Sequence, residues 1–219
     1  MRAQLASPFW AVLAVLAVLA MVASALPSPN PFAFADADYD SVSPLWEVAP
    51  HPGAAPIFLN GTVEQVYAKL VEINPNYDDD WKDEGDNENA EPGLQTRDDD
   101  DYYVNPLTCI NPEIGPFKKH VMSGIKYLRK VKGRPHLPAN SCGRVSCSWD
   151  SAIYWCNDKD HDAYIPSFNN IADGAQVIVN ECPRSSSDWA TIMGMLTHGA
   201  DLWRVVVSHP GFYRDGRWC

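Results

Sequence analysis

The sequence predicts an α+β protein in which helices cover one face of a small antiparallel sheet stapled by disulfides. Residues 142–156 alternate apolar and polar side chains with the period of two that is typical of half-buried strands. Residues 117–131 and 168–182 instead repeat apolar side chains at helical spacing. All six cysteines lie beyond residue 108. Helices on one side of an antiparallel sheet form a two-layer sandwich.

The first 25 residues have the pattern of a secretory signal peptide. Arg2 precedes an unbroken apolar run over residues 11–23, and small residues follow at a cleavage position that ends with Ala25. The apolar run is shorter than the roughly 20 residues that a transmembrane helix requires. We therefore expect a secreted, extracellular protein with no stable membrane span.

Residues 26–101 are predicted to be a mostly disordered leader, rich in proline and then in acidic residues. Residues 1–101 carry 18 acidic and 4 basic side chains (net −14), whereas residues 102–219 carry 10 and 13 (net +3). Charge and cysteine content therefore change in the same region. We expect the leader to be removed near Arg97 and residues 102–219 to be the folded domain.

Two local signals interrupt this leader. Asn60 begins an Asn-Gly-Thr sequence, the acceptor pattern for N-glycosylation in a secreted protein. A short helix is predicted over residues 62–73, and it lacks a core of its own. The alternative to a removable leader is that this helix docks permanently on the domain through Val66 and Leu70.

The six cysteines are expected to form three disulfides, because their number is even and the predicted compartment is oxidising. Closely spaced Cys/His pairs that would indicate zinc do not occur. A local bond between Cys147 and Cys156, across the predicted hairpin, is the one pairing that we expect. The cysteines are Cys109, Cys142, Cys147, Cys156, Cys182 and Cys219.

The elements of the domain follow in the order helix, strand, strand, helix, strand, strand. The helix over residues 117–131 has a basic outer face, and the hairpin of residues 142–156 turns at Asp150-Ser151. The second helix begins at Ser167 and carries Cys182 on its apolar face. Strands over residues 193–196 and 203–207 complete the sheet. Trp149, Trp155 and Trp203 are expected in the core and Trp218 on the surface.

Several of these motifs resemble those of small secreted cysteine-rich proteins of filamentous fungi. The shared features are the Gly-Ile-x-Tyr-Leu-Arg helix at residues 124–129, the Cys-x-Arg-Val-Ser-Cys-Ser hairpin that ends in Trp-Cys-Asn-Asp, the Ile-Ala-Asp-Gly-Ala helix and the Trp-x-Val-x-Val strand. This layout is similar to that of extracellular-effector (necrosis-inducing-factor-like) and killer-toxin-like proteins. The resemblance covers residues 109–219 and brings no catalytic motif.

The residues give little support to catalysis. The Gly-x-Ser-x-Gly and His-Glu-x-x-His motifs are absent from the sequence, and the cysteine-rich part has only two glutamates, Glu113 and Glu181. The acidic loop over residues 157–162 lacks the glycine and closing glutamate of a calcium loop, so neither a metal nor another cofactor is expected.

The expected function is that of a secreted effector or toxin-like glycoprotein, which binds a host or competitor cell-surface component and not nucleic acid. The alternatives are a small secreted hydrolase, such as a nuclease that uses His198 or His161, and a wall-associated structural protein.

Overall fold

The structure is a computed structural model that describes residues 40–82, 107–110, 114–183, 185–199, 201–212 and 219. These residues belong to one compact unit. The predicted signal peptide with Ala25, the acidic residues 83–101 with Arg97, and Glu113 and Trp218 lie outside the described residues.

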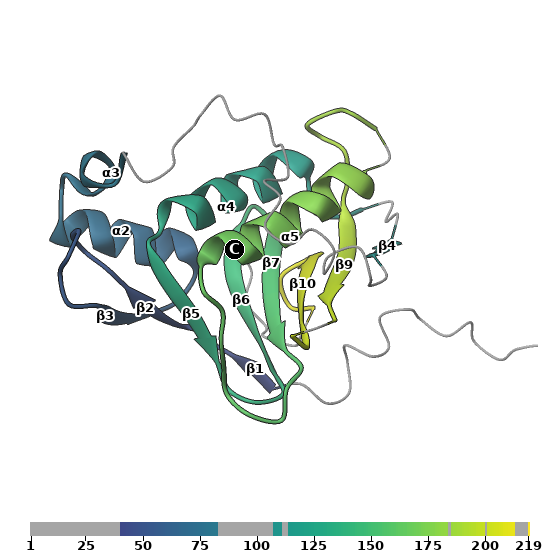
Figure 1. The fold of residues 1–219 in the computed structure, drawn as a ribbon. Helices are drawn as coiled ribbons and strands as arrows, with labels where there is room; N and C mark the ends of the chain where they lie inside the picture. Colours follow the sequence, from purple (N-terminus) through teal and green to yellow (C-terminus); the bar gives the residue numbers. More distant parts are fainter. Residues whose placement is uncertain (1–39, 83–106, 111–113, 184, 200, 213–218) are drawn as a thin grey trace, which may run out of the picture. The chain divides into compact units, whose positions relative to one another are not determined.

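The larger of two sheets has six strands in the order β1-β6-β7-β10-β9-β4 (Figure 1). Its neighbouring strands are antiparallel except for β1 and β6, which are parallel. The predicted strand pairs are confirmed as β6 with β7 and β9 with β10. The strands are β1 (Asp40–Val42), β4 (Leu107–Ile110), β6 (Ser141–Ser148), β7 (Ser151–Asn157), β9 (Met193–His198) and β10 (Trp203–Ser208).

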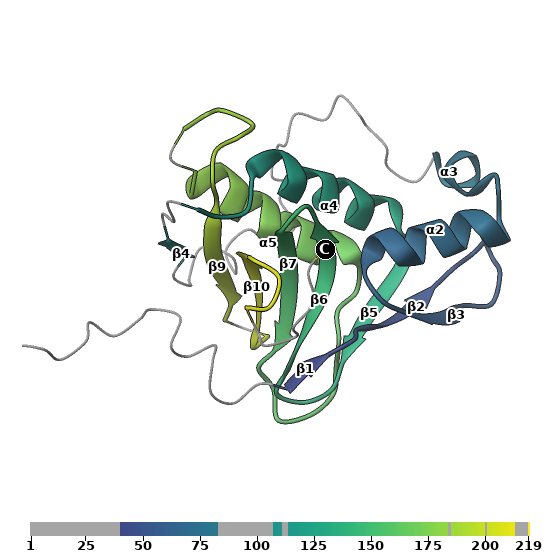
Figure 2. The same ribbon diagram turned by 180° about the vertical axis from the view of Figure 1, so that it is seen from behind.

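Two helices, α4 (Lys118–Lys130) and α5 (Phe168–Glu181), lie side by side on one face of this sheet (Figures 1 and 2). Glycines allow their close approach. A Cβ added to Gly124 of α4 would come within 2.2 Å of Ser146 Oγ, and one added to Gly174 of α5 within 2.8 Å of a Val205 methyl group. The predicted combination of helices and a sheet is therefore confirmed, and apolar side chains of both helices form the core between them.

A second sheet of four strands, which the sequence did not predict, has the order β3-β2-β5-β8. Its central residue is Trp46, which is fully buried and stacks on Phe168 of α5 with the ring centroids 4.7 Å apart. Trp46 Nε1 also donates a hydrogen bond to the carbonyl oxygen of Gly61 (2.8 Å). The strands are β2 (Leu45–Val48), β3 (Ile57–Asn60), β5 (Gly133–Leu137) and β8 (Ala163–Tyr164).

The expectation of a disordered leader is wrong for residues 40–82, because strands β1, β2 and β3 pair within the two sheets. The predicted helix is confirmed as α2 (Val63–Ile73), and it docks on α4 as the alternative interpretation required. The short helix α3 (Tyr77–Asp80) follows it. β1 and β2 have only three or four residues, and their partners β6 and β5 lie about 85–100 positions away, so they leave little periodicity that a sequence can reveal. β3 pairs with the nearby β2.

Polar contacts fasten the second half of this N-terminal segment to the end of α4. Lys130 Nζ lies 2.7 Å from a carboxylate oxygen of Asp78. The buried Tyr77 hydroxyl accepts a hydrogen bond from the Lys132 backbone N–H (2.9 Å). Burial of this hydroxyl raises the pKa of Tyr77 to about 12. These contacts join residues that are more than 50 positions apart in the sequence, so the segment is an integral part of the fold.

The prediction of three disulfides is confirmed, but the predicted Cys147–Cys156 pair is wrong. The bonds are Cys109–Cys182, Cys142–Cys156 and Cys147–Cys219. The hairpin turns one residue earlier than expected, and a bulge between Arg144 and Ser146 shifts the register. Cys142 therefore lies opposite Cys156, whereas Cys147 lies opposite Ala152.

Candidate functional site

The most unusual surface of the described structure is a group of exposed rings, which we call the aromatic cluster: Phe117, His120, Trp149 and Trp189. Trp149 is 75% exposed, Trp189 58% and Phe117 37%. The four residues come from three places: the tip of the β6–β7 hairpin, the start of α4 and the loop before β9. Aromatic side chains left in solvent by three separate segments are typical of a binding surface.

Trp149 lies at the tight turn of the hairpin, a position at which large aromatic side chains are rare. Trp149 and Asp150 are the two central residues of the turn, and their φ angles are +47° and +56°. Turns with two positive φ angles favour Asn-Gly and Asp-Gly. A bulky residue in this region is strained by about 1–3 kcal/mol. The fold keeps this strain while leaving the ring in solvent, which points to a role outside the core.

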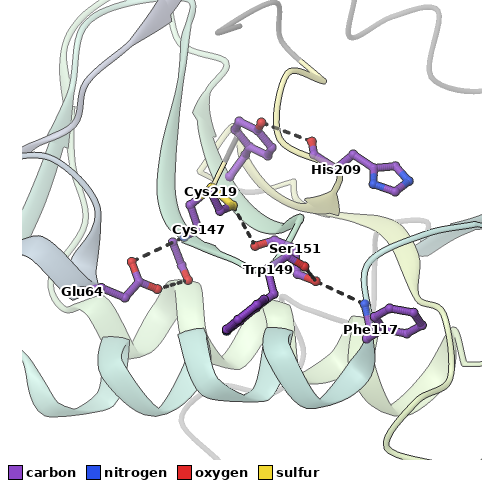
Figure 3. The surroundings of a disulfide bond; sticks show 9 residues. Glu64, Phe117, Cys147, Trp149, Ser151, His209 and Cys219 are labelled. Atoms are coloured by element: carbon purple, nitrogen blue, oxygen red, sulfur yellow. Dashed lines mark hydrogen bonds between the residues drawn. A yellow bond between two sulfur atoms is a disulfide. The ribbon is translucent and has the colours of Figure 1, made fainter. Parts of the chain in front are cut away.

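The Ser151 hydroxyl joins the hairpin tip to the start of α4 (Figure 3). Its oxygen accepts a hydrogen bond from the Phe117 backbone N–H (3.2 Å), and it donates to the carbonyl oxygen of Trp149 (3.3 Å). A hydroxyl can fill both roles because it has one donor and two acceptor lone pairs. The backbones of two cluster residues are thus fixed by one buried side chain.

The loop that carries Trp189 is joined to the same end of α4 by backbone hydrogen bonds. The Lys118 N–H donates to the Ala190 carbonyl oxygen and the Lys119 N–H to the Asp188 carbonyl oxygen, both at 2.9 Å. The Ile192 N–H donates to the Pro116 carbonyl oxygen at 2.8 Å. The first N–H groups of a helix lack partners within the helix. Here the loop supplies them, and Trp189 is held beside Phe117 as a result.

The rings of the cluster contact one another. The His120 ring is stacked on Trp149, with a centroid separation of 6.0 Å and an angle of 25° between the planes. The Trp189 ring meets Phe117 edge-on at 5.6 Å, and Lys119 Nζ lies 4.2 Å above the Trp189 ring centre. Offset-stacked and edge-to-face contacts of this kind fix the orientation of aromatic side chains. The cluster is consequently preorganised.

The base of the hairpin is also anchored. Cys147 is bonded to Cys219, and this bond fastens the last residue of the chain to the hairpin. Figure 3 shows Glu64 on the other side of Cys147. Ser146 Oγ donates to one carboxylate oxygen of Glu64 (2.6 Å), and the Cys147 N–H approaches the other at 3.4 Å. The N-terminal segment therefore supports the hairpin on which Trp149 is presented.

The His120 imidazole has a lowered pKa, because desolvation and the neighbouring Lys119 ammonium both disfavour its protonated form. His120 is thus neutral at neutral pH. A protonated imidazole quenches the emission of an adjacent indole. We expect tryptophan emission of the protein to change as the pH falls below the ordinary pKa of histidine, and His120→Gln to remove that component. The control is His198→Gln, because His198 also stacks on a tryptophan, Trp203. An unchanged titration in His120→Gln would contradict the assignment.

The histidines considered for hydrolysis make local contacts. His198 stacks on Trp203 with the ring centroids 4.8 Å apart, and its Nδ1 lies 3.6 Å from a carboxylate oxygen of Asp201. His161 is exposed and lies beside its sequence neighbour Asp160 (2.8 Å). Glu181 is exposed at the end of α5. These contacts do not join the two histidines and Glu181 in one site.

The acidic loop that follows β7 is occupied by contacts with the protein itself. Asp158 lies 3.2 Å from Arg204, and the Asn157 amide donates hydrogen bonds to the carbonyl oxygens of Pro138 and His161, each at 2.8 Å. Within the described residues, no group of three or more His, Cys, Asp or Glu side chains could hold a metal ion.

Sequence reasoning missed most of the aromatic cluster. Trp155 and Trp203 are buried as expected, but the prediction of a core position for Trp149 is wrong. The alternating pattern assigned Trp149 to a strand face, whereas the hairpin turns at this residue. Trp189 follows a serine-rich loop, and no sequence pattern indicated where its side chain would lie. The one signal that could have identified the site was the Ser-Trp-Asp-Ser sequence, which has turn residues on both sides of a tryptophan.

Comparisons with protein-family models, with curated proteins and with solved structures find no match to this chain. Among the residues that the structure describes, no helix is both long and apolar enough to cross a membrane. The functional argument therefore depends on the geometry of the aromatic cluster.

Proposed function

We propose that this chain is a secreted, disulfide-stabilised protein of the effector or toxin-like type, which acts by binding the carbohydrate of a cell surface or cell wall. The observation that carries the proposal is the aromatic cluster. Sugars present flat faces of C–H bonds with partial positive charge, and these stack on the electron-rich face of an indole. Trp149, which is 75% exposed and held at a strained turn, offers such a face.

Two carboxylates beside the cluster favour a carbohydrate over a lipid surface, although the Lys119 ammonium also lies over the Trp189 ring. Each exposed tryptophan has an exposed aspartate as its sequence neighbour, Asp150 beside Trp149 and Asp188 beside Trp189. Inserting the rings into a bilayer would carry these carboxylates into an apolar medium at a high free-energy cost. Sugar hydroxyls instead donate hydrogen bonds to carboxylates. An exposed indole ring beside a carboxylate therefore suits the binding of a polysaccharide.

The test is retention of the secreted protein on insoluble chitin, β-glucan and cellulose, with dye leakage from anionic vesicles measured in parallel. Trp149→Ala and Trp189→Ala are each expected to weaken retention about tenfold or more, the loss typical of a central aromatic contact. Tyr164→Ala is the matched control, because Tyr164 is 48% exposed and lies on the other sheet. Retention that survives in the double tryptophan variant, or leakage without retention, would overturn the proposal.

Trp149→Gly separates binding from stability. Glycine adopts a φ of +47° without a Cβ clash, so we expect this variant to be more stable than the wild type by about 1 kcal/mol. We also expect it to lose retention on the polysaccharide, since the ring is absent. Urea unfolding and the retention assay measure the two effects. A less stable Trp149→Gly variant would show that the ring has a structural role.

A further inference from the structure

The smaller sheet has one face turned away from the core. Burial alternates along β2 and β3, and in β3 Ile57 and Leu59 pack toward the core, whereas Phe58 and Asn60 are exposed. The strand registers then define two rows across this outer face. One row is Phe58, Glu47 and Arg134, and the other is Asn60, Leu45, His136 and Tyr164.

Phe58 and Asn60 are neighbours on this face. Residues two positions apart on a strand are about 6.6 Å apart along it and point the same way. Phe58 is 59% exposed, and the acceptor asparagine is exposed as well. Thr62, which completes the acceptor sequence, follows directly at the N-cap of α2. The order is therefore an aromatic ring, an acceptor amide and a threonine at alternate positions.

We propose that Asn60 carries an N-glycan whose first N-acetylglucosamine packs on the ring of Phe58. The sugar is joined to the Asn60 side-chain nitrogen, so its pyranose ring starts beside the phenyl face. Sugar C–H groups are attracted to the negative face of an aromatic ring. Phe58 gains a partner, and the sugar loses freedom that it would otherwise keep. The glycan thereby becomes part of the outer face of the small sheet.

The position of β3 in the sheet gives this glycan a second effect. β3 is an edge strand, next to β2 alone among the described strands. Three of its four residues are apolar. A short apolar edge can pair with another chain, and proteins block such edges with charges, prolines or coverings. A glycan at the last residue of β3 is a bulky, solvated covering of that kind.

The inference rests on the proposed entry into the secretory pathway. The experiment therefore measures glycosylation of Asn60 separately from secretion directed by residues 1–25. The chain from Leu26 is produced behind the host's own signal sequence in a eukaryotic host, so that glycosylation does not depend on residues 1–25. Intact mass reports glycan occupancy at Asn60, with Asn60→Gln as the unglycosylated reference. Secretion directed by residues 1–25 is tested separately with the complete chain.

The decisive measurement compares two trimming enzymes. One cuts within the glycan core and leaves a single N-acetylglucosamine, and the other removes the whole glycan. We expect the melting temperature to stay unchanged after the first treatment and to fall by about 2–4 °C after the second, the shift that roughly 1 kcal/mol produces in a domain of this size.

The matched control is Phe58→Ala, in which complete deglycosylation is expected to shift the melting temperature by less than about 1 °C. Glycosylated wild type should also aggregate more slowly than the deglycosylated protein. Two results would overturn the proposal. The first is an unmodified Asn60 in the secreted protein, and the second is an equal thermal shift in the wild type and Phe58→Ala.

Discussion

Replacing Trp46 with alanine is expected to lower the free energy of unfolding by about 3–5 kcal/mol, the range for deleting a buried aromatic side chain. Trp46 is fully buried, stacks on Phe168 and donates a hydrogen bond to the carbonyl oxygen of Gly61. Urea unfolding followed by circular dichroism measures the change. The matched control is Trp189→Ala, which removes the same side chain from the surface and should cost no more than about 1 kcal/mol.

Deleting the whole N-terminal segment tests the same contacts more severely. A chain that starts at Asp98 lacks β1, β2 and β3 and the helix α2. β5 then loses its pairing with β2, and the face of α4 under α2 becomes exposed. We expect this chain to show no cooperative unfolding transition, whereas a chain that starts at Leu26 folds. Equal melting temperatures for the two chains would restore the interpretation of residues 26–97 as a dispensable leader.

Removing the Cys147–Cys219 disulfide is expected to destabilise the protein by about 4 kcal/mol. The bond closes a loop of 72 residues, and the entropy lost by the unfolded chain increases with loop length. Both cysteines are replaced together, as Cys147→Ser with Cys219→Ser, so that no free thiol remains. The change in the midpoint of urea unfolding is the readout.

A comparison of disulfides separates loop length from position. The Cys109–Cys182 bond closes a loop of nearly the same length, with a separation of 73 residues, so removing it should cost a similar amount. The two variants should differ in polysaccharide retention, since only Cys147 lies at the base of the hairpin that bears Trp149. A non-reducing peptide map must first show Cys147 joined to Cys219, and Cys147 joined to any other cysteine would contradict the structure. Equal retention in the two variants would mean that the bond does not position Trp149.

The helices could be predicted from the sequence because their signals are local. Ser167 accepts a hydrogen bond from the Asn169 N–H at the start of α5, and Thr62 is the N-cap of α2. Gly133 and Pro135 follow Lys130, the last residue of α4, by three and five positions. Each of these features depends on side chains only a few positions apart, so the local sequence is sufficient to predict where a helix begins and ends.

Most of the strands that were missed depend on partners distant in sequence, whereas β3 pairs with β2 only 9 to 15 positions away. The segment Leu45–Val48 forms strand β2 by pairing with β5, which lies about 90 residues later. No property of Leu45–Val48 alone reveals that pairing. The bulge at Val145 is equally hidden, because it becomes visible only when β6 is laid against β7. A one-residue shift in a hairpin exchanges the faces of its side chains. The earlier turn explains the wrong place for Trp149, and the turn and the bulge together explain the wrong disulfide.

The disulfides have a further consequence, since all three lie within residues 109–219. Residues 40–82 are held in place by noncovalent contacts and by the continuity of the chain. A single peptide-bond cut between residues 82 and 107 would turn the intramolecular docking of this segment into an association of two molecules. Its occupancy would then follow mass action, and dilution would release it, because the high effective concentration supplied by the chain would be gone.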